Sequence, residues 1–190
     1  PYKMTIHGDT RIDDYYWMRL SDKQKNAKEF DSQTNKVVEY IDLENEYTKE
    51  SLSHTEKFQE DLFNEIIGRI EQNDESVPYF KNGYFYYSRY ESDKEYRIHC
   101  RKKGSLESNE EIILDENILA KGHDYFAIGG RTVSPNNMWL AYGVDTLSRR
   151  IYEIHFKNLE TGEILQTTIK NSSGSVAWAN DNNTLFYTSK

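Results

Sequence analysis

Histidines and the one cysteine are the side chains in this sequence best suited to metal binding or nucleophilic chemistry. The five histidines are scattered, at positions 7, 54, 99, 123 and 155, and no two stand four residues apart as helical metal ligands often do. A site formed by His99 and His155 on neighbouring strands is geometrically possible, but strand histidines more often pack or hydrogen-bond within a core. Cys100 lies in a strand pattern, which favours a packed thiol over a reactive one.

Paired acids are the second source of chemistry to consider, because two carboxylates can divide acid and base roles. Three such pairs occur, Asp13-Asp14, Glu110-Glu111 and Asp115-Glu116, and adjacent acids on a strand or loop usually face water. No serine stands in the Gly-x-Ser-x-Gly turn that exposes a hydrolase nucleophile, and Gly129-Gly130 lacks phosphate-loop spacing. We therefore predict no catalytic residue, no metal site and no cofactor site within these residues.

The composition describes an acidic, aromatic-rich globular chain. Of the 190 residues, 36% are hydrophobic and 15 are tyrosines, and the formal net charge is −8. The tyrosines supply buried area, which argues against disorder, and the negative charge argues against nucleic-acid binding. The single cysteine permits no internal disulfide, no apolar run approaches the roughly 18 residues of a membrane span, and no secretory signal pattern occurs. We expect a cytoplasmic protein with no nucleic-acid or membrane partner.

Residues 134–170 have the pattern of three short strands, each preceded by a turn. Proline fixes φ in Ser134-Pro135-Asn136-Asn137 and asparagine tolerates positive φ, while Thr161-Gly162 forms a later turn before a strand expected at Ile164–Ile169. The pattern then restarts, and the turn at Asn180–Asn183 follows the first by about 46 residues, close to the period of propeller blades. The sequence therefore predicts antiparallel propeller blades.

An earlier blade begins near Tyr79, where Asn82-Gly83 separates two aromatic runs and gives a strong hairpin signal. The Tyr84–Tyr87 run could stack bases or sugars, but packing within a sheet explains it better because no basic patch accompanies it. In the last blade, Thr184–Ser189 should be an exposed edge strand paired with Val176–Trp178, with Trp178 buried against the blade before it. The predicted blades cover residues 77–115, 125–170 and, incomplete, 175–190.

Residues 1–76 have helical periodicity and are predicted to form an N-terminal helical arm. Asp13 is placed to cap a short helix, and Ser21–Thr34 is predicted to be a loose helix or a surface loop. Asn35–Leu52 forms the first long helix, and Ser53–Glu56 has the form of a capping box at the start of the second. The fold class is therefore α+β, a helical arm followed by about two blades and part of a third in residues 77–190.

The second long helix, which should continue to Ile70, carries a continuous apolar stripe. An exposed stripe of this size must be covered by a large partner. In the isolated chain we expect it to drive self-association or docking of the arm onto the blades. The stripe consists of Phe58, Leu62, Phe63, Ile66, Ile67 and Ile70.

Several long motifs occur in a consistent order over nearly the whole chain. Residues 1–76 contain R-I-D-D-Y-Y-W-M-R, E-Y-I-D-L-E-N-E-Y-T and F-N-E-I-I-G-R-I. The blades contain S-V-P-Y-F-K-N-G-Y-F-Y-Y-S-R, K-E-Y-R-I-H-C-R, E-E-I-I-L-D-E-N-I-L-A-K-G-H, S-P-N-N-M-W-L-A-Y and V-A-W-A-N-D-N-N-T-L-F-Y-T. Together these motifs resemble the prolyl oligopeptidase family of serine peptidases, and within it the oligopeptidase B branch, which cuts after basic residues.

This resemblance implies a two-domain serine peptidase, of which the chain is an N-terminal fragment. An α/β-hydrolase domain would carry the Ser-Asp-His triad beyond residue 190, and the arm would pack on that domain. A seven-bladed propeller would cover the active site and admit only short peptides. None of the family's catalytic residues falls within this chain, so we expect it to be inactive alone. A prolyl-cleaving relative and a non-catalytic propeller that binds partners are the alternatives.

Overall fold

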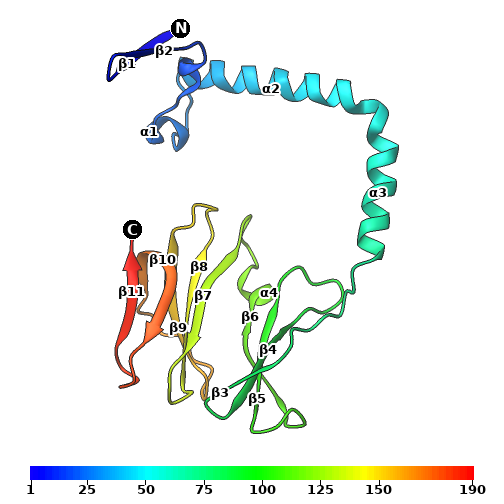
Figure 1. Cartoon of the computed structure of the whole chain (residues 1–190), viewed down its shortest axis with the longest axis vertical. Coiled ribbons are helices and arrows are strands. Elements are labelled where there is room, and N and C mark those ends of the chain that lie inside the picture. The colour runs from blue at the N-terminus through cyan, green and yellow to red at the C-terminus, as the bar shows by residue number, and fades with distance from the viewer. The chain divides into compact units, whose positions relative to one another are not determined.

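The computed structural model describes residues 1–190 and divides into two compact units, Pro1–Ile70 and Glu71–Lys190. The first unit is largely helical, and the second contains two antiparallel sheets (Figure 1). The prediction of a helical segment followed along the chain by antiparallel propeller blades is confirmed. No helix in the structure is both long and apolar enough to cross a membrane.

The first unit begins with a hairpin that the sequence analysis missed. β1 (Tyr2–Ile6) pairs with β2 (Asp9–Asp13) across a turn in which His7 and Gly8 both have positive φ. That geometry is typical of tight hairpins, but a histidine is an uncommon residue for it, so the signal was weak. The Asp13 carboxylate then accepts a hydrogen bond from the Tyr15 amide, where a short 3₁₀ helix, η1 (Tyr16–Met18), follows.

The stretch predicted as a loose helix or loop contains two well-defined helix starts. α1 (Asp22–Lys25) begins with a capping box in which Ser21 and Gln24 satisfy each other's backbone amides. α2 (Ser32–Leu52) begins earlier than expected, because the Asp31 carboxylate accepts a 2.8 Å hydrogen bond from the Thr34 amide.

α2 is anchored at its first turns by Trp17. The Trp17 ring meets Tyr40 edge to face, and the Trp17 carbonyl accepts a hydrogen bond from the Gln33 side chain. Thr34 and Val37 are the residues of this unit that are buried. Because only these two residues of α2 are buried, the rest of the helix contributes little to the packing of this unit.

The capping box predicted at Ser53–Glu56 is wrong. Ser53–Thr55 forms the 3₁₀ helix η2, and the Ser53 hydroxyl donates backward to the Glu50 carbonyl instead of accepting from a later amide. The chain therefore turns directly from α2 into α3 (Glu56–Gly68), which has no side-chain cap. The six residues of the predicted apolar stripe are all exposed in the structure.

The first sheet of the second unit has four strands in sequence order. They are β3 (Tyr79–Lys81), β4 (Tyr84–Arg89), β5 (Ile98–Lys103) and β6 (Glu110–Asp115), and the short helix α4 (Glu116–Leu119) follows. Asn82 and Gly83 both have positive φ, which confirms the predicted tight hairpin. Along β4, Tyr86 and Tyr87 are buried in two separate clusters, so the aromatic run is used for packing, as predicted.

The second sheet has five strands in the order β11-β10-β9-β8-β7 (Figure 1). Its strands are β7 (Ala127–Val133), β8 (Trp139–Asp145), β9 (Tyr152–Asn158), β10 (Ile169–Trp178) and β11 (Leu185–Ser189). The predicted strand at Ile164–Ile169 is wrong. Only one bridge, between Ile164 and Lys157, forms there, and regular pairing starts at Ile169.

β10 joins the second blade to the third. Its first half pairs with β9, through Ile169 opposite Ile154, and its second half pairs with β11, through Trp178 opposite Leu185. The predicted pairing of the last two strands is confirmed. Trp178, which was predicted to be buried against the second blade, is only partly buried. Its indole still packs on the second blade, because it meets Phe156 edge to face and donates to the Thr132 carbonyl.

The two sheets bury a shared apolar cluster. Tyr86, Ile113 and Leu114 come from the first sheet, and Leu140 and Tyr142 come from β8 of the second. All five side chains are at most 6% exposed. Burial of this aromatic and aliphatic area is the main stabilising contribution between the sheets.

Asparagines at equivalent turns connect neighbouring blades. Asn82, Asn137 and Asn182 each have positive φ. The Asn137 side chain donates to the Asn82 carbonyl at 2.9 Å, and the Asn182 side chain accepts from the Asn136 amide at 2.7 Å. The second contact joins residues 46 positions apart, which is the blade period expected from the sequence.

Glycines allow the backbone of β10 to approach β7 and β8. A Cβ on Gly143 would lie 2.8 Å from Gly174 Cα, and one on Gly130 would lie 2.6 Å from the Gly174 carbonyl oxygen. Gly129 faces the Tyr152 ring in the same region. The Gly129-Gly130 pair therefore serves close backbone packing.

We predict that Gly143→Ala destabilises the second unit by about 1–3 kcal/mol, because the added methyl group meets immovable backbone. The change should lower the urea midpoint followed by tryptophan fluorescence. Gly68→Ala is the control, because a Cβ at Gly68 meets nothing within 4 Å. Equal midpoints for the wild type and the Gly143→Ala variant would show that β10 is not held against β8 as described.

Candidate functional site

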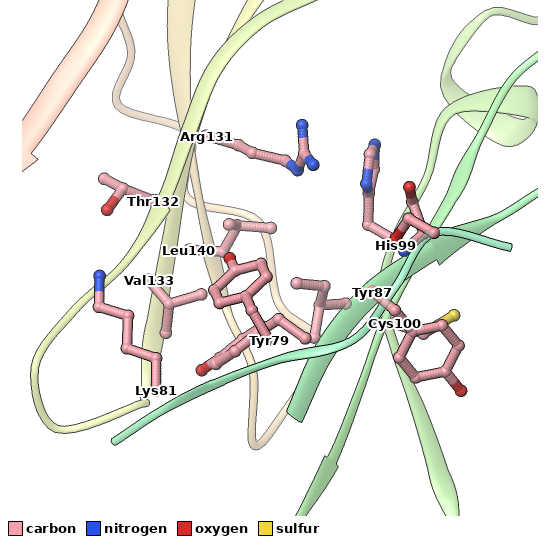
Figure 2. A pocket seen from close by; sticks show the side chains of 13 residues that line it. Tyr79, Lys81, Tyr87, His99, Cys100, Arg131, Thr132, Val133 and Leu140 are labelled. Atoms are coloured by element: carbon pink, nitrogen blue, oxygen red, sulfur yellow. Dashed lines mark hydrogen bonds between the residues drawn. The ribbon is translucent and has the colours of Figure 1, made fainter. Parts of the chain in front are cut away.

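A cavity of about 110 Å³ lies between the two sheets of the second unit. Its walls come from β3 and the adjoining strands of the first sheet, and from β7 and β8 of the second. Figure 2 shows the side chains around it. The polar and charged residues are the ones that bear on function, namely Ser76, Tyr79, Lys81, Ser88, His99, Arg131 and Thr132.

His99 is the buried polar residue of this cavity. Its side chain is 2% exposed, and Nε2 lies 2.5 Å from a carboxylate oxygen of Glu116, at the start of α4. Because a carboxylate accepts, this contact places a proton on Nε2. Nδ1 is buried and has no hydrogen-bond partner. An orphaned buried nitrogen of this kind calls for a specific explanation.

Two cations line the cavity beside His99. The Arg131 side chain extends from β7 toward the His99 ring, and Lys81 lies at the end of β3 (Figure 2). Both side chains are exposed, and neither forms an ion pair. No aspartate or glutamate is among the lining residues. The cavity is therefore locally cationic in a chain of net charge −8.

β-Bulges precede or adjoin both His99 and Arg131. The register of β7 against β8 shifts between Ile128 and Arg131, and that of β5 against β6 shifts between His99 and Cys100. A bulge turns the following side chain and often adjoins functional sites. Gly129-Gly130 permits the shift in β7, so the local sequence sets the direction of Arg131.

The structure does not bring His99 and His155 together. His155 stacks on Tyr142 and lines a different cavity, and burial lowers its pKa. The hypothesis of a shared metal site is therefore wrong. Sequence reasoning also missed Arg131, whose one signal is the Gly-Gly pair that precedes it in a strand.

Cys100 is fully buried beside Tyr87 and Ile98, which confirms the prediction of a packed thiol. Burial raises the pKa of Cys100 to about 12, so the nucleophilic thiolate is scarce near neutral pH.

The prediction that the paired acids simply face water is wrong for most of them. Glu110 accepts hydrogen bonds from two nitrogens of the Arg89 guanidinium and a 2.5 Å bond from the Tyr87 hydroxyl. Asp115 caps α4 through the Asn117 amide, and Glu116 binds His99. Glu110 and Glu116 bind partners at least 17 residues away, which the local pattern could not reveal, whereas the Asp115 cap is a local contact.

Comparison with known proteins places the chain among peptidases. Residues 2–190 match the family model described as prolyl oligopeptidase, N-terminal beta-propeller domain. The chain is 37% identical to dipeptidyl aminopeptidase BI of Pseudoxanthomonas mexicana, a match that covers 97% of this chain and 26% of that protein. It is 30% identical to Protease 2 of Moraxella lacunata, with 99% and 27% covered.

Among solved structures, oligopeptidase B from Leishmania major is similar in both fold and sequence. The TM-score is 0.83 at 28% identity, over 96% of this chain and 25% of that one. The chain thus spans about a quarter of the length of the curated relatives it matches.

The ion pair between Arg89 and Glu110 should make stability depend on pH. Hydrogen bonds from Arg89, aided by Tyr87, lower the pKa of Glu110 from 4.5 to about 2. A depressed pKa adds stability that is complete above the ordinary value and is lost as the pH falls through the folded value. We predict that the stability difference between wild type and Glu110→Gln shrinks as the pH falls from above 4.5 toward 2.

Urea unfolding at a series of pH values measures this difference. Glu160→Gln removes an exposed carboxylate in the turn that follows β9 and is the matched control. If Glu110→Gln and Glu160→Gln gave the same pH profile, the ion pair would contribute nothing to folding.

Proposed function

This chain belongs to the prolyl oligopeptidase family of peptidases, and from that premise we propose that it is the N-terminal part of a serine oligopeptidase. The proposed reaction is hydrolysis of short peptides after arginine or lysine. The observation that carries this proposal is the similarity to oligopeptidase B, which covers nearly the whole chain. The resemblance of the sequence motifs to the same branch supports it independently.

We propose that catalysis is performed by a further α/β-hydrolase domain of the same polypeptide. The chain contains no Gly-x-Ser-x-Gly turn to expose a nucleophile. Residues 1–76 would form the arm that packs on that domain, and residues 77–190 would begin the propeller that limits substrate size. The exposed apolar stripe of α3 supports such docking, since a surface of this kind normally meets a partner.

A dipeptidyl aminopeptidase is the second candidate, because the relative with 37% identity carries that name. Such an enzyme would require a free peptide N-terminus, whereas an oligopeptidase B-like enzyme would read the basic side chain. A prolyl-cleaving relative and a non-catalytic propeller remain as alternatives from the sequence. A cytoplasmic location is part of the proposal and rests on the single cysteine, which is free and buried.

The specificity of the full-length protein distinguishes these functions. We expect rapid cleavage of an N-terminally blocked peptide after arginine, and slow cleavage when citrulline or proline replaces that arginine. Citrulline is the matched control because it keeps the shape of arginine and removes its charge. Cleavage only of the unblocked peptide would favour the dipeptidyl aminopeptidase, and cleavage only after proline would favour the prolyl-cleaving relative.

The 190-residue chain alone should show neither cleavage nor labelling by a serine-directed fluorophosphonate. Nucleophile, base and oxyanion donors must lie within hydrogen-bonding distance of one another, and no such set occurs in it. Labelling of any serine in this chain above the rate of the denatured protein would refute the assignment of catalysis to another domain.

The α3 stripe should cause concentration-dependent self-association of the isolated chain. We expect Phe63→Ser to weaken this association, because Phe63 is among the most exposed residues of the stripe. Gln59→Ser changes the polar face of the same helix and should have no effect. Light scattering over a range of concentrations measures the outcome, and a monomer at every concentration would contradict the prediction.

A further inference from the structure

We propose that the cavity between β3 and β7 binds a small oxyanion of the carboxylate or phosphate class. No part of this inference depends on peptidase activity. It rests on the charge of the lining, on the orphaned nitrogen of His99, and on the bulge in β7 that precedes Arg131.

The charge of the lining selects an anion. Arg131 and Lys81 bring two positive charges, and the lining contains no acid to neutralise them. Glu116 attracts Arg131 electrostatically, but it is not a lining residue and its carboxylate already binds Nε2 of His99. A guanidinium can bind both oxygens of a carboxylate or phosphate at once, which makes Arg131 the principal ligand.

The orphaned nitrogen defines how the anion binds to His99. With one proton held on Nε2 by Glu116, the neutral ring offers only a lone pair at Nδ1. An oxyanion therefore binds there together with one proton, which either the ligand carries, as in hydrogen phosphate, or the imidazole takes up. That proton lies between Nδ1 and a ligand oxygen. A water molecule could satisfy Nδ1 alone, whereas an anion would contact Nδ1 and the Arg131 guanidinium together.

The size of the cavity agrees with a small group. Its volume of about 110 Å³ holds several water molecules or one carboxylate or phosphate group. Serine and tyrosine hydroxyls from Ser76, Ser88 and Tyr79 line the same space and can donate to further oxygens. The ligand is therefore either a free small anion or the terminal carboxylate of a peptide.

Nuclear magnetic resonance of the full chain with ¹⁵N-labelled histidine tests this site. Sodium phosphate and sodium acetate are titrated separately at fixed pH, with sodium chloride holding the ionic strength constant. We expect a saturable shift of the His99 ring signals. Arg131→Gln should weaken binding at least about tenfold, equivalent to about 1.4 kcal/mol. Arg131 makes no ion pair in the structure, so this variant should still fold.

Arg149→Gln is the matched control, because it removes the same charge from an exposed turn away from the cavity lining. Unchanged affinity in this variant supports the site. A tripeptide with a free C-terminus is then compared with its amide. Competition by the acid alone identifies a peptide carboxylate as the ligand, and binding of phosphate or acetate alone identifies a free anion. No saturable shift of His99 with any anion, or equal weakening in both arginine variants, would overturn the proposal.

Discussion

The burial of aromatic side chains between the two sheets is the interaction on which the rest of the second unit depends. Neither sheet can cover its own apolar face, so Tyr86 of the first sheet and Tyr142 of the second must share one core. Their packing brings the turns into hydrogen-bonding range, where Asn137 accepts from the Tyr86 hydroxyl and donates to the Asn82 carbonyl. The cavity lined by His99 and Arg131 lies between the same two sheets and shares Tyr86 and Leu140 with this core.

The parts of the fold that depend on local chemistry could be predicted from the sequence. The Asn82-Gly83 turn, the asparagine pairs of later turns, alternating aromatic residues and the period of about 46 residues identified the blades. The predictions that failed concern residues whose side chains or backbone can form contacts other than those the local pattern suggests. Ser53 donates backward to the Glu50 carbonyl, and so it does not cap α3. Ile164–Ile169 has strand-forming residues, but only Ile164 and Ile169 meet β9 in register.

The candidate site was harder to predict than the fold, because it requires strand register. His99 was considered for chemistry only together with His155, and packing was preferred, whereas the structure pairs His99 with Glu116 and places Arg131 in the same cavity. Arg131 follows a bulge in β7, and a bulge shifts register by a residue and is poorly marked in sequence. Glu110 was predicted to face water. Its partners Arg89 and Tyr87 lie two strands away in the sheet, so the contact depends on a strand order that the local sequence does not show.

The pairing of β10 with strands on both sides has a consequence for the order in which the chain folds during synthesis. Nearly every strand of the second unit pairs with its neighbour in sequence, so contact order is low and each sheet can form as its residues leave the ribosome. Once Ile169 has paired with β9, the second half of the same strand already projects as a template for β11. Each completed blade thus presents a strand on which the next blade can pair during synthesis.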